Sequence, residues 1–193
     1  RRSGRPRTAH STPRATAMTL PPGLRKLVLT VHVTSSVGWL GAVAAYLALA
    51  IAGLTAQDAQ TVHAVWIALV STGWFVIAPL ALAALLTGIV QALGTEWGLF
   101  RHYWVLVKFL LTVFASAVLL LHLPTVSRLA ATAAAMDSAN PTALRGELLH
   151  AGGGLLVLLV TTTLAVYKPR GMTPYGWRKQ LERRTVPHRD TGK

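Results

Sequence analysis

The sequence predicts an all-α membrane protein, a four-helix up-down bundle with its N-terminus and C-terminus on the cytoplasmic side. Three observations predict this fold class. The 193 residues are 52% hydrophobic and only 13% charged, with a mean hydropathy of +0.47. The apolar residues are gathered in four long blocks, and the Lys and Arg residues are concentrated on one side of them. Such a composition excludes an ordinary soluble domain.

Each apolar block is long enough to cross a bilayer, since about 20 helical residues span a hydrocarbon core of ~30 Å. Lipid offers the backbone no hydrogen-bond partner, so each block must be a helix. The four predicted spans are residues 27–54, 64–93, 103–123 and 148–167. Together they form one transmembrane domain, 27–167. We expect a disordered basic tail over residues 1–26, of which 1–17 precede Met18, and a basic cytoplasmic tail over residues 168–193.

The positive charges decide the orientation. Of the 19 Lys and Arg residues, 17 lie before the first block, around the connection between the second and third blocks, or after the last block. Only Arg128 and Arg145 lie in the other two connections. This asymmetry satisfies the positive-inside rule for four spans with both termini inside. We therefore expect the net charge of +13 to face anionic lipids of the inner leaflet, with no nucleic acid as partner.

Local signals set the details of each span. In the first block, Ser35, Ser36, Gly38 and Gly41 allow close helix packing. Pro79 predicts a kink in the second block. The third block is expected to end at Pro124, with a short surface helix over the Ala-rich residues 129–136. Asn140 and Pro141 resemble an N-cap and first helical residue for the fourth helix, which Lys168 and Pro169 end.

Absent motifs narrow the possible chemistry. The chain has no cysteine, which excludes disulfides, thiolate metal sites and covalently attached c-type haem. It also has no phosphate-binding glycine loop and no nucleophile elbow, which argues against a nucleotide-driven or hydrolytic enzyme. Whether the chain is an enzyme stays open.

A first candidate site combines two ionisable residues inside the spans. His32 and Lys108 each lie five residues into an outward-running helix, at matching depth, about 8 Å from the cytoplasmic boundary. Ser36 and Trp39 share a helix face with His32. The set is a candidate cofactor-binding pocket. The alternative is that Lys108 extends to the interface and His32 bonds a helix carbonyl.

A second candidate site gathers histidines at the opposite side of the membrane. Glu147 and His150 stand in E-x-x-H spacing, which places them on one helix face, and His63 and His122 lie at the same level on other helices. These four residues are candidate ligands for zinc or copper, and two of the histidines could instead hold haem b. Residues 152–154, all glycine, leave a groove for a flat cofactor or a neighbouring helix. Ordinary interfacial histidines are the alternative.

The segment His32-Val-Thr-Ser-Ser-Val-Gly-Trp39-Leu-Gly41 resembles the first-helix signature of the superfamily that includes CopD copper-resistance proteins and HemJ, the membrane protoporphyrinogen oxidase. Trp104-Val-Leu-Val-Lys108 is similar to a Trp-x-x-x-Lys motif of HemJ. Overall the chain looks most like uncharacterised four-helix membrane proteins of bacteria. The resemblance implies a multi-pass protein of the bacterial cytoplasmic membrane, with His32 as a haem b ligand and Lys108 beside a porphyrin propionate.

The sequence thus favours a small integral membrane protein that binds haem b or a similar planar ligand in its helix bundle, with a redox or haem-related role. One alternative is copper or zinc handling through the second candidate site. Another is a non-catalytic subunit or assembly partner whose glycine-lined faces bind another membrane protein or a second copy of the chain.

Overall fold

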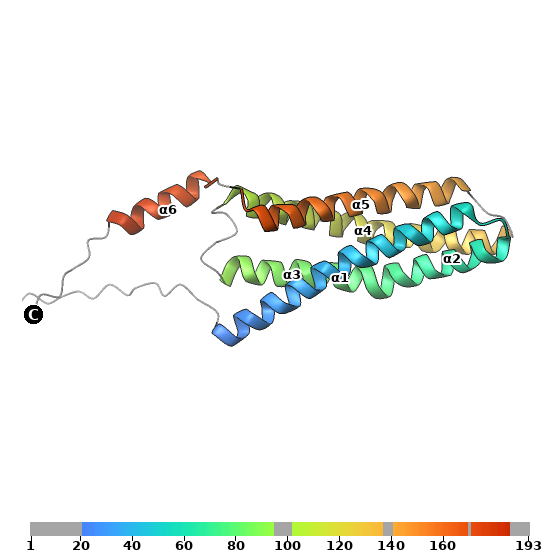
Figure 1. The fold of residues 1–193 in the computed structure, drawn as a ribbon, viewed down its shortest axis with the longest axis horizontal. Helices are drawn as coiled ribbons and strands as arrows, with labels where there is room; N and C mark the ends of the chain where they lie inside the picture. Colours follow the sequence, from blue (N-terminus) through green and yellow to red (C-terminus); the bar gives the residue numbers. More distant parts are fainter. Residues whose placement is uncertain (1–20, 95–101, 137–140, 170, 186–193) are drawn as a thin grey trace, which may run out of the picture.

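The structure, a computed structural model, describes residues 21–94, 102–136, 141–169 and 171–185. Its main feature is a bundle of four long apolar helices that run up and down, as Figure 1 shows. The helices that could cross a membrane are Pro22–Thr55, Ala59–Leu93, Tyr103–Ala134 and Thr142–Tyr167. The predicted all-α bundle of four membrane helices is therefore confirmed.

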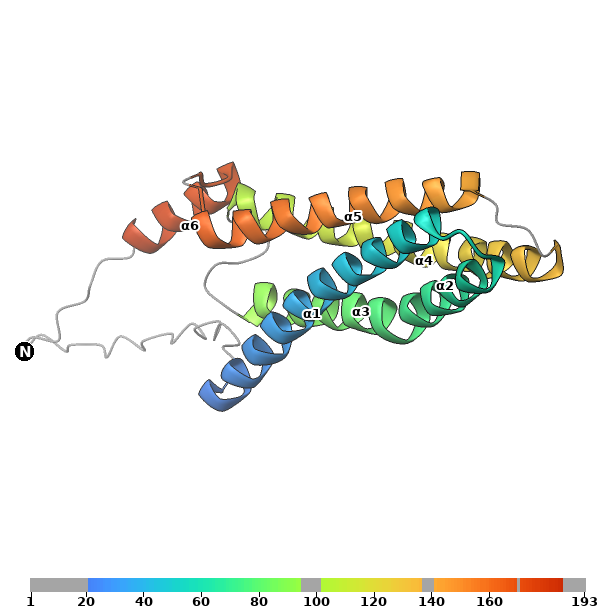
Figure 2. The same ribbon diagram turned by 45° about the vertical axis from the view of Figure 1, so that its right-hand side comes forward.

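The elements in chain order are α1 (Pro22–Thr55), α2 (Ala59–Thr72), η1 (Gly73–Ile77), α3 (Ala78–Gly94), α4 (Tyr103–Met136), α5 (Pro141–Tyr167) and α6 (Pro174–Thr185). Together, α2, η1 and α3 form one continuous helical segment that is long enough to cross a membrane. Helix α1 runs obliquely across the bundle and packs on α2, α3 and α5 (Figure 2), and α4 packs on α2, α3 and α5.

Helix α1 buries one face and exposes the rest to lipid. Its buried residues recur at steps of three and four, which keeps them on one side of the helix; they are Ser35, Trp39, Val43, Tyr46, Ala50 and Gly53. Pro22 starts the helix, since proline suits the first helical position. Residues 22–26 are therefore helical, and the predicted tail boundary at residue 26 was wrong.

The connection between α1 and α2 is shorter than the sequence indicated. Asp58 caps α2, because its carboxylate accepts a hydrogen bond of 2.7 Å from the backbone N–H of Thr61. This bond holds the pKa of the Asp58 carboxyl below its ordinary value. The second membrane helix accordingly begins at Ala59, five residues earlier than predicted.

The irregularity expected at Pro79 is a turn of π-helix immediately upstream, η1. The backbone N–H of Ala78 donates to the carbonyl of Gly73, five residues back. Gly73 also faces α4, since a Cβ at this position would lie 2.6 Å from Leu123 Cδ2. A π-turn of this kind adjusts the direction of the helix near a proline.

Helix α4 continues through Pro124 to Met136. The predicted end at Pro124 and the separate surface helix over residues 129–136 were therefore wrong. Proline removes one backbone donor, but ending the helix in an apolar environment would leave several backbone groups without partners. The far part of α4 is also held from the side, because Trp74 Nε1 donates to Ser127 Oγ at 3.1 Å.

Helix α5 has the predicted bounds, from Pro141 to Tyr167. The backbone then turns at Lys168, whose φ is 43°. The sequence did not predict a helix in the basic tail, where α6 forms. Its segment is tied to the start of α4 by a hydrogen bond from the Tyr103 N–H to the Gly171 carbonyl. As a result α6 lies at the end of the bundle where α1 begins (Figure 1).

Candidate functional site

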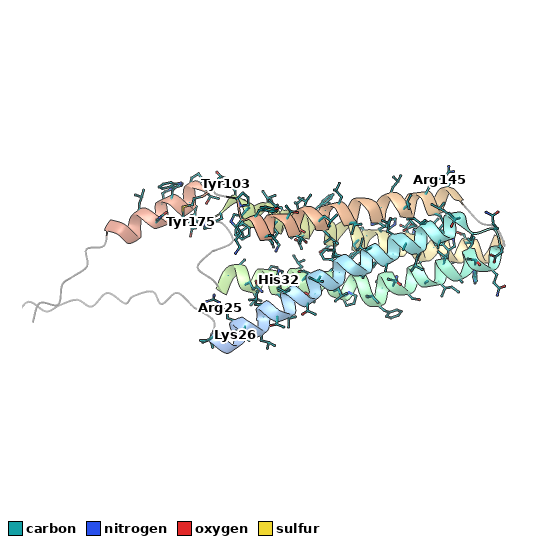
Figure 3. All side chains as sticks on the ribbon, viewed as in Figure 1. Arg25, Lys26, His32, Tyr103, Arg145 and Tyr175 are labelled. Carbon is teal, nitrogen blue, oxygen red and sulfur yellow. The ribbon has the colours of Figure 1, made fainter. Side chains whose placement is uncertain are left out.

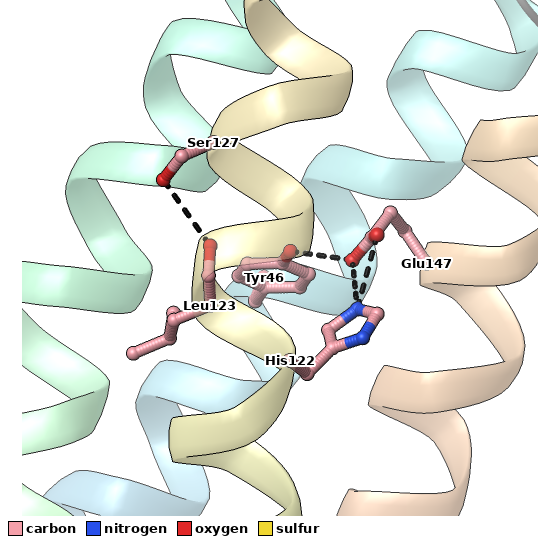
Figure 4. A network of polar contacts seen from close by, with 5 residues as sticks. All are labelled: Tyr46, His122, Leu123, Ser127 and Glu147. Carbon is pink, nitrogen blue, oxygen red and sulfur yellow. Dashed lines mark hydrogen bonds and ion pairs between the residues drawn. The ribbon is translucent and has the colours of Figure 1, made fainter.

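The most buried polar group of the described residues is a carboxylate. Glu147 on α5 is 1% exposed, and the Tyr46 hydroxyl from α1 donates to its Oε2 at 2.7 Å. His122 Nε2 from α4 lies 3.1 Å from both carboxylate oxygens, as Figure 4 shows. We name Tyr46, His122, Glu147 and His150 the Glu147 cluster. It joins three helices through one acceptor group.

The direction of this bond follows from the carboxylate, because the oxygens of an ionised carboxylate only accept hydrogen bonds. An N–H that donates to a carboxylate can be shared between both oxygens, whereas a protonated carboxyl has only one hydrogen to give to a ring nitrogen. Nε2 therefore carries the hydrogen. In the neutral ring, Nδ1 of His122 is then the nitrogen with a free lone pair, and it points away from the carboxylate (Figure 4).

His150 completes the cluster by stacking on His122. The two ring centroids are 3.8 Å apart and the planes are inclined by 20°. Parallel stacked rings do not aim their nitrogens at one point, as two ligands of a single metal ion must. The described residues contain no group of three or more His, Asp or Glu side chains suited to a metal ion. His63 is exposed near the start of α2 and takes no part in these contacts. The zinc or copper site stays a prediction.

A cavity of about 340 Å³ borders the Glu147 cluster, between α1, η1, α4 and α5. Its walls are mostly apolar, and its polar or aromatic lining includes Trp39, Tyr46, His122 and His150. Gly153 and Gly154 line it as well, and a Cβ at Gly153 would meet no atom within 4 Å. Part of the predicted glycine groove thus faces the cavity.

The cavity opens to the lipid-facing side of the bundle. Phe114 on α4 and Leu149 on α5 both line it, and their side chains are 61% and 76% exposed. His150 lines the cavity as well and forms no hydrogen bond among the described residues. The site therefore combines apolar walls, a lateral opening and two imidazole rings.

The other candidate residues gather around His32, in a separate place. His32 Nδ1 lies 3.0 Å from the Ala84 carbonyl and 3.1 Å from Thr87 Oγ1, both on α3. The Thr87 hydroxyl itself donates to the Ala83 carbonyl, so Nδ1 is the donor to both of its neighbours. A Cβ at Gly88 would lie 3.2 Å from His32 Cε1, which shows how closely the ring lies against α3.

Gln91 adds a second bond between the same helices, because its Nε2 donates to the Val28 carbonyl at 3.2 Å. Lys108 on α4 is near enough to His32 to interact with it electrostatically, with no hydrogen bond between the two. We name His32, Thr87, Gln91 and Lys108 the His32 cluster. Its bonds mainly fasten α1 to α3.

The residues predicted to form a haem pocket are only partly brought together. His32 Nε2 has no hydrogen-bond partner in the described part of the chain, and an Nδ1–H that donates to a carbonyl is the usual arrangement behind a ligating Nε2. His32 and Lys108 therefore fit the chemistry of a haem site. Trp39, however, lines the cavity beside the Glu147 cluster, and Ser36 is half-buried without a hydrogen bond to the described residues. Haem ligation by His32 stays a prediction.

Tyr46 is a site residue that the sequence patterns did not predict. The signal was present, because Tyr46 lies seven residues after Trp39 and fourteen after His32, a spacing that returns to the same helix face. The alternative that His32 bonds a helix carbonyl is the one the structure shows, with Ala84 as the acceptor, although the sequence indicated neither that carbonyl nor Thr87. Backbone acceptors leave no trace in side-chain patterns, so no sequence motif indicated that contact.

Comparisons of the chain with protein-family models, curated proteins and solved structures found no match. The resemblance of the first and third membrane helices to CopD and HemJ therefore stays a prediction. The function must be argued from the two clusters and the cavity.

Proposed function

We propose that this multi-pass membrane protein binds a planar, lipid-soluble ligand inside its helix bundle and serves redox or haem-related chemistry. The cavity beside the Glu147 cluster carries this proposal. Binding sites for small molecules combine apolar walls with a few placed polar groups, and this cavity has that make-up. Its lateral opening suits a ligand that reaches the protein from the lipid.

The shape and chemistry of the walls support a flat ligand. Trp39 offers an aromatic face, and the glycines at 153 and 154 leave one wall without side chains. A volume of about 340 Å³ is at the lower end of the usual range for ligand pockets. This favours a ligand of one or two rings over a complete porphyrin, and haem b is the second candidate.

We also propose the orientation that the sequence predicts, with both termini in the cytoplasm of a bacterial cell. Arg25 and Lys26 lie at the end of the bundle where α1 begins, and Arg145 lies at the opposite end (Figure 3). Lys168 directly follows α5, and Arg178 is on α6. Reporter fusions near residues 58 and 137 should give an extracytoplasmic signal, and C-terminal fusions a cytoplasmic one. A cytoplasmic signal at residue 137 would refute this orientation.

The ligand proposal is tested on the protein purified in lipid nanodiscs. An absorption spectrum detects bound haem, metal analysis detects copper or zinc, and mass spectrometry of an organic extract detects small aromatic molecules. We expect an aromatic molecule that co-purifies in near-stoichiometric amount. A protein that carries none of these ligands and takes up none on addition contradicts the proposal.

Two neighbouring glycines provide a matched pair of variants. Gly153→Leu adds a side chain at a residue that lines the cavity, and Gly152→Leu adds the same side chain one residue away, outside the lining. Neither new Cβ meets an atom within 4 Å. Filling the cavity should lower ligand occupancy by at least about tenfold, since the ligand and the new side chain compete for the same volume. The Gly152 variant should retain the ligand.

A further inference from the structure

We infer that the ligand of this cavity is a ring with a phenolic hydroxyl, of the hydroquinone class, and that Nδ1 of His122 accepts the hydroxyl hydrogen. The inference rests on the proposed function and names the chemical class that the same cavity selects. Glu147 is the positioning residue, because its carboxylate decides which nitrogen of His122 carries the hydrogen.

The orientation of His122 is set by Glu147. Its Nε2 is held 3.1 Å from both oxygens of a carboxylate that is 1% exposed. The Tyr46 hydroxyl donates to the same carboxylate from the other side, at 2.7 Å, so Glu147 is fixed in place as an acceptor. A buried carboxylate surrounded by donors keeps the imidazole in a single tautomer.

This tautomer of His122 determines whether its free ring nitrogen accepts or donates a hydrogen bond. His122 lines the cavity, and the nitrogen that does not bond Glu147 is an acceptor in the neutral ring. Acceptors in an apolar cavity favour a ligand with a matching donor, because an unmatched polar group loses its hydrogen bonds to water on binding. A ring hydroxyl supplies that donor. An ether or an unsubstituted ring does not.

The cavity is also open toward the lipid. The opening is bordered by Phe114 and Leu149, which are both largely exposed. A ring bound between Trp39 and the histidine pair can therefore carry an apolar tail that leaves between α4 and α5. The combination of a hydrogen-bonding ring inside and an apolar tail outside is the chemistry of membrane-soluble hydroquinones.

The test compares two stable probes that share one ring system, 1-naphthol and 1-methoxynaphthalene. Only the first has a hydroxyl that donates. Equilibrium binding to the intact protein in nanodiscs should show 1-naphthol bound about tenfold more tightly, the effect of one hydrogen bond in an apolar site. Equal affinities overturn the inference and leave the proposed function in place. If neither probe binds saturably, and Gly153→Leu changes nothing, the proposed function fails as well.

Glu147→Gln gives the sharper outcome. The glutamine oxygen can still accept from Tyr46, while its amide N–H now donates to His122 Nε2, so the hydrogen of the neutral ring moves to Nδ1. The preference for 1-naphthol should then disappear or reverse in favour of 1-methoxynaphthalene, whose oxygen only accepts. Retained binding of 1-methoxynaphthalene shows that the cavity is intact. An unchanged preference overturns the role of Glu147.

A second variant covers the case in which Glu147→Gln alone does not fold. The double variant His122→Phe, Glu147→Gln keeps an aromatic ring in the stack and leaves the glutamine paired with Tyr46. It removes the accepting nitrogen altogether. The two probes should then bind equally, and a remaining preference of about tenfold for 1-naphthol contradicts the inference.

Discussion

The two polar clusters of the bundle use the same residue type in different ways. In the His32 cluster, the imidazole donates to a backbone carbonyl and a threonine hydroxyl of the neighbouring helix, and its ring lies against Gly88. In the Glu147 cluster, the imidazole of His122 donates to a buried carboxylate and borders a cavity. The partner of each histidine and the space beside it separate these roles.

The physical difference between the two clusters is the charge that each contact buries. A bond to a helix carbonyl adds no charge and joins two helices, an interaction that averages about 0.6 kcal/mol in membrane proteins. A buried carboxylate must be matched by donors on every side, and the groups that match it are fixed in orientation. Of the two clusters, the Glu147 cluster should therefore contribute more to the free energy of unfolding, and its donors and acceptors have the better-defined orientation.

The largest expected effect is at Glu147. Glu147→Ala leaves the buried Tyr46 hydroxyl and the half-buried His122 Nε2 without their acceptor, and we expect a loss of about 2–5 kcal/mol in unfolding free energy. Reversible unfolding in mixed micelles measures it. Glu147→Gln keeps an acceptor for Tyr46 and should cost about 1 kcal/mol or less. Similar small losses for both variants would show that the carboxylate is not the centre of the cluster.

His32→Ala should have a smaller effect, confined to helix packing. It removes the bonds to the Ala84 carbonyl and Thr87, which predicts a loss of about 1–2 kcal/mol in unfolding free energy. Ligand occupancy of the cavity should be unchanged. A wild-type protein with a Soret band that His32→Ala abolishes would reverse the comparison and place haem at the His32 cluster.

The ends of the bundle differ in charge as well, and α6 tests that difference. Trp177 and Arg178 are exposed on this helix, which suits a position on an anionic leaflet. A peptide of residues 171–193 should prefer anionic over neutral vesicles by about 1 kcal/mol for each cation near the surface. Vesicle sedimentation at moderate salt measures the ratio. Equal binding to both vesicle types would mean that the basic residues do not interact with lipid.

The smallest effect is expected at Gly88. Its substitution by Ala places a Cβ 3.2 Å from His32 Cε1, so the ring must shift by a few tenths of an ångström. The strain should roughly cancel the gain of up to about 1 kcal/mol that alanine brings to a helix interior. Gly41→Ala is the control, since no atom lies within 4 Å of its Cβ, and it should be neutral or stabilising. Equal stability gains for both variants would show that His32 is not packed tightly on α3.

The sequence also predicted part of the site, but it did not predict which neighbouring helix each residue contacts. Few ionisable residues occur within apolar blocks, so the sequence grouped Glu147, His122 and His150 with His63 as candidate ligands. The structure brings the first three into contact and leaves His63 exposed elsewhere. Trp39 was grouped with His32 because they share a face of α1. In the bundle that face runs past two neighbours, α3 at one end and α5 at the other, so the two residues have different surroundings.

By itself, the sequence determined that this chain forms four apolar helices in a membrane, because hydrocarbon leaves the backbone no alternative to internal hydrogen bonds. It also determined that α5 runs from Pro141 to Tyr167. Only the tertiary structure decided that Tyr46 meets Glu147, that α4 continues through Pro124, and that a cavity lies beside His122. These outcomes depend on how the helices rotate and interlock, and that depends on all the side chains at an interface together rather than on any local segment.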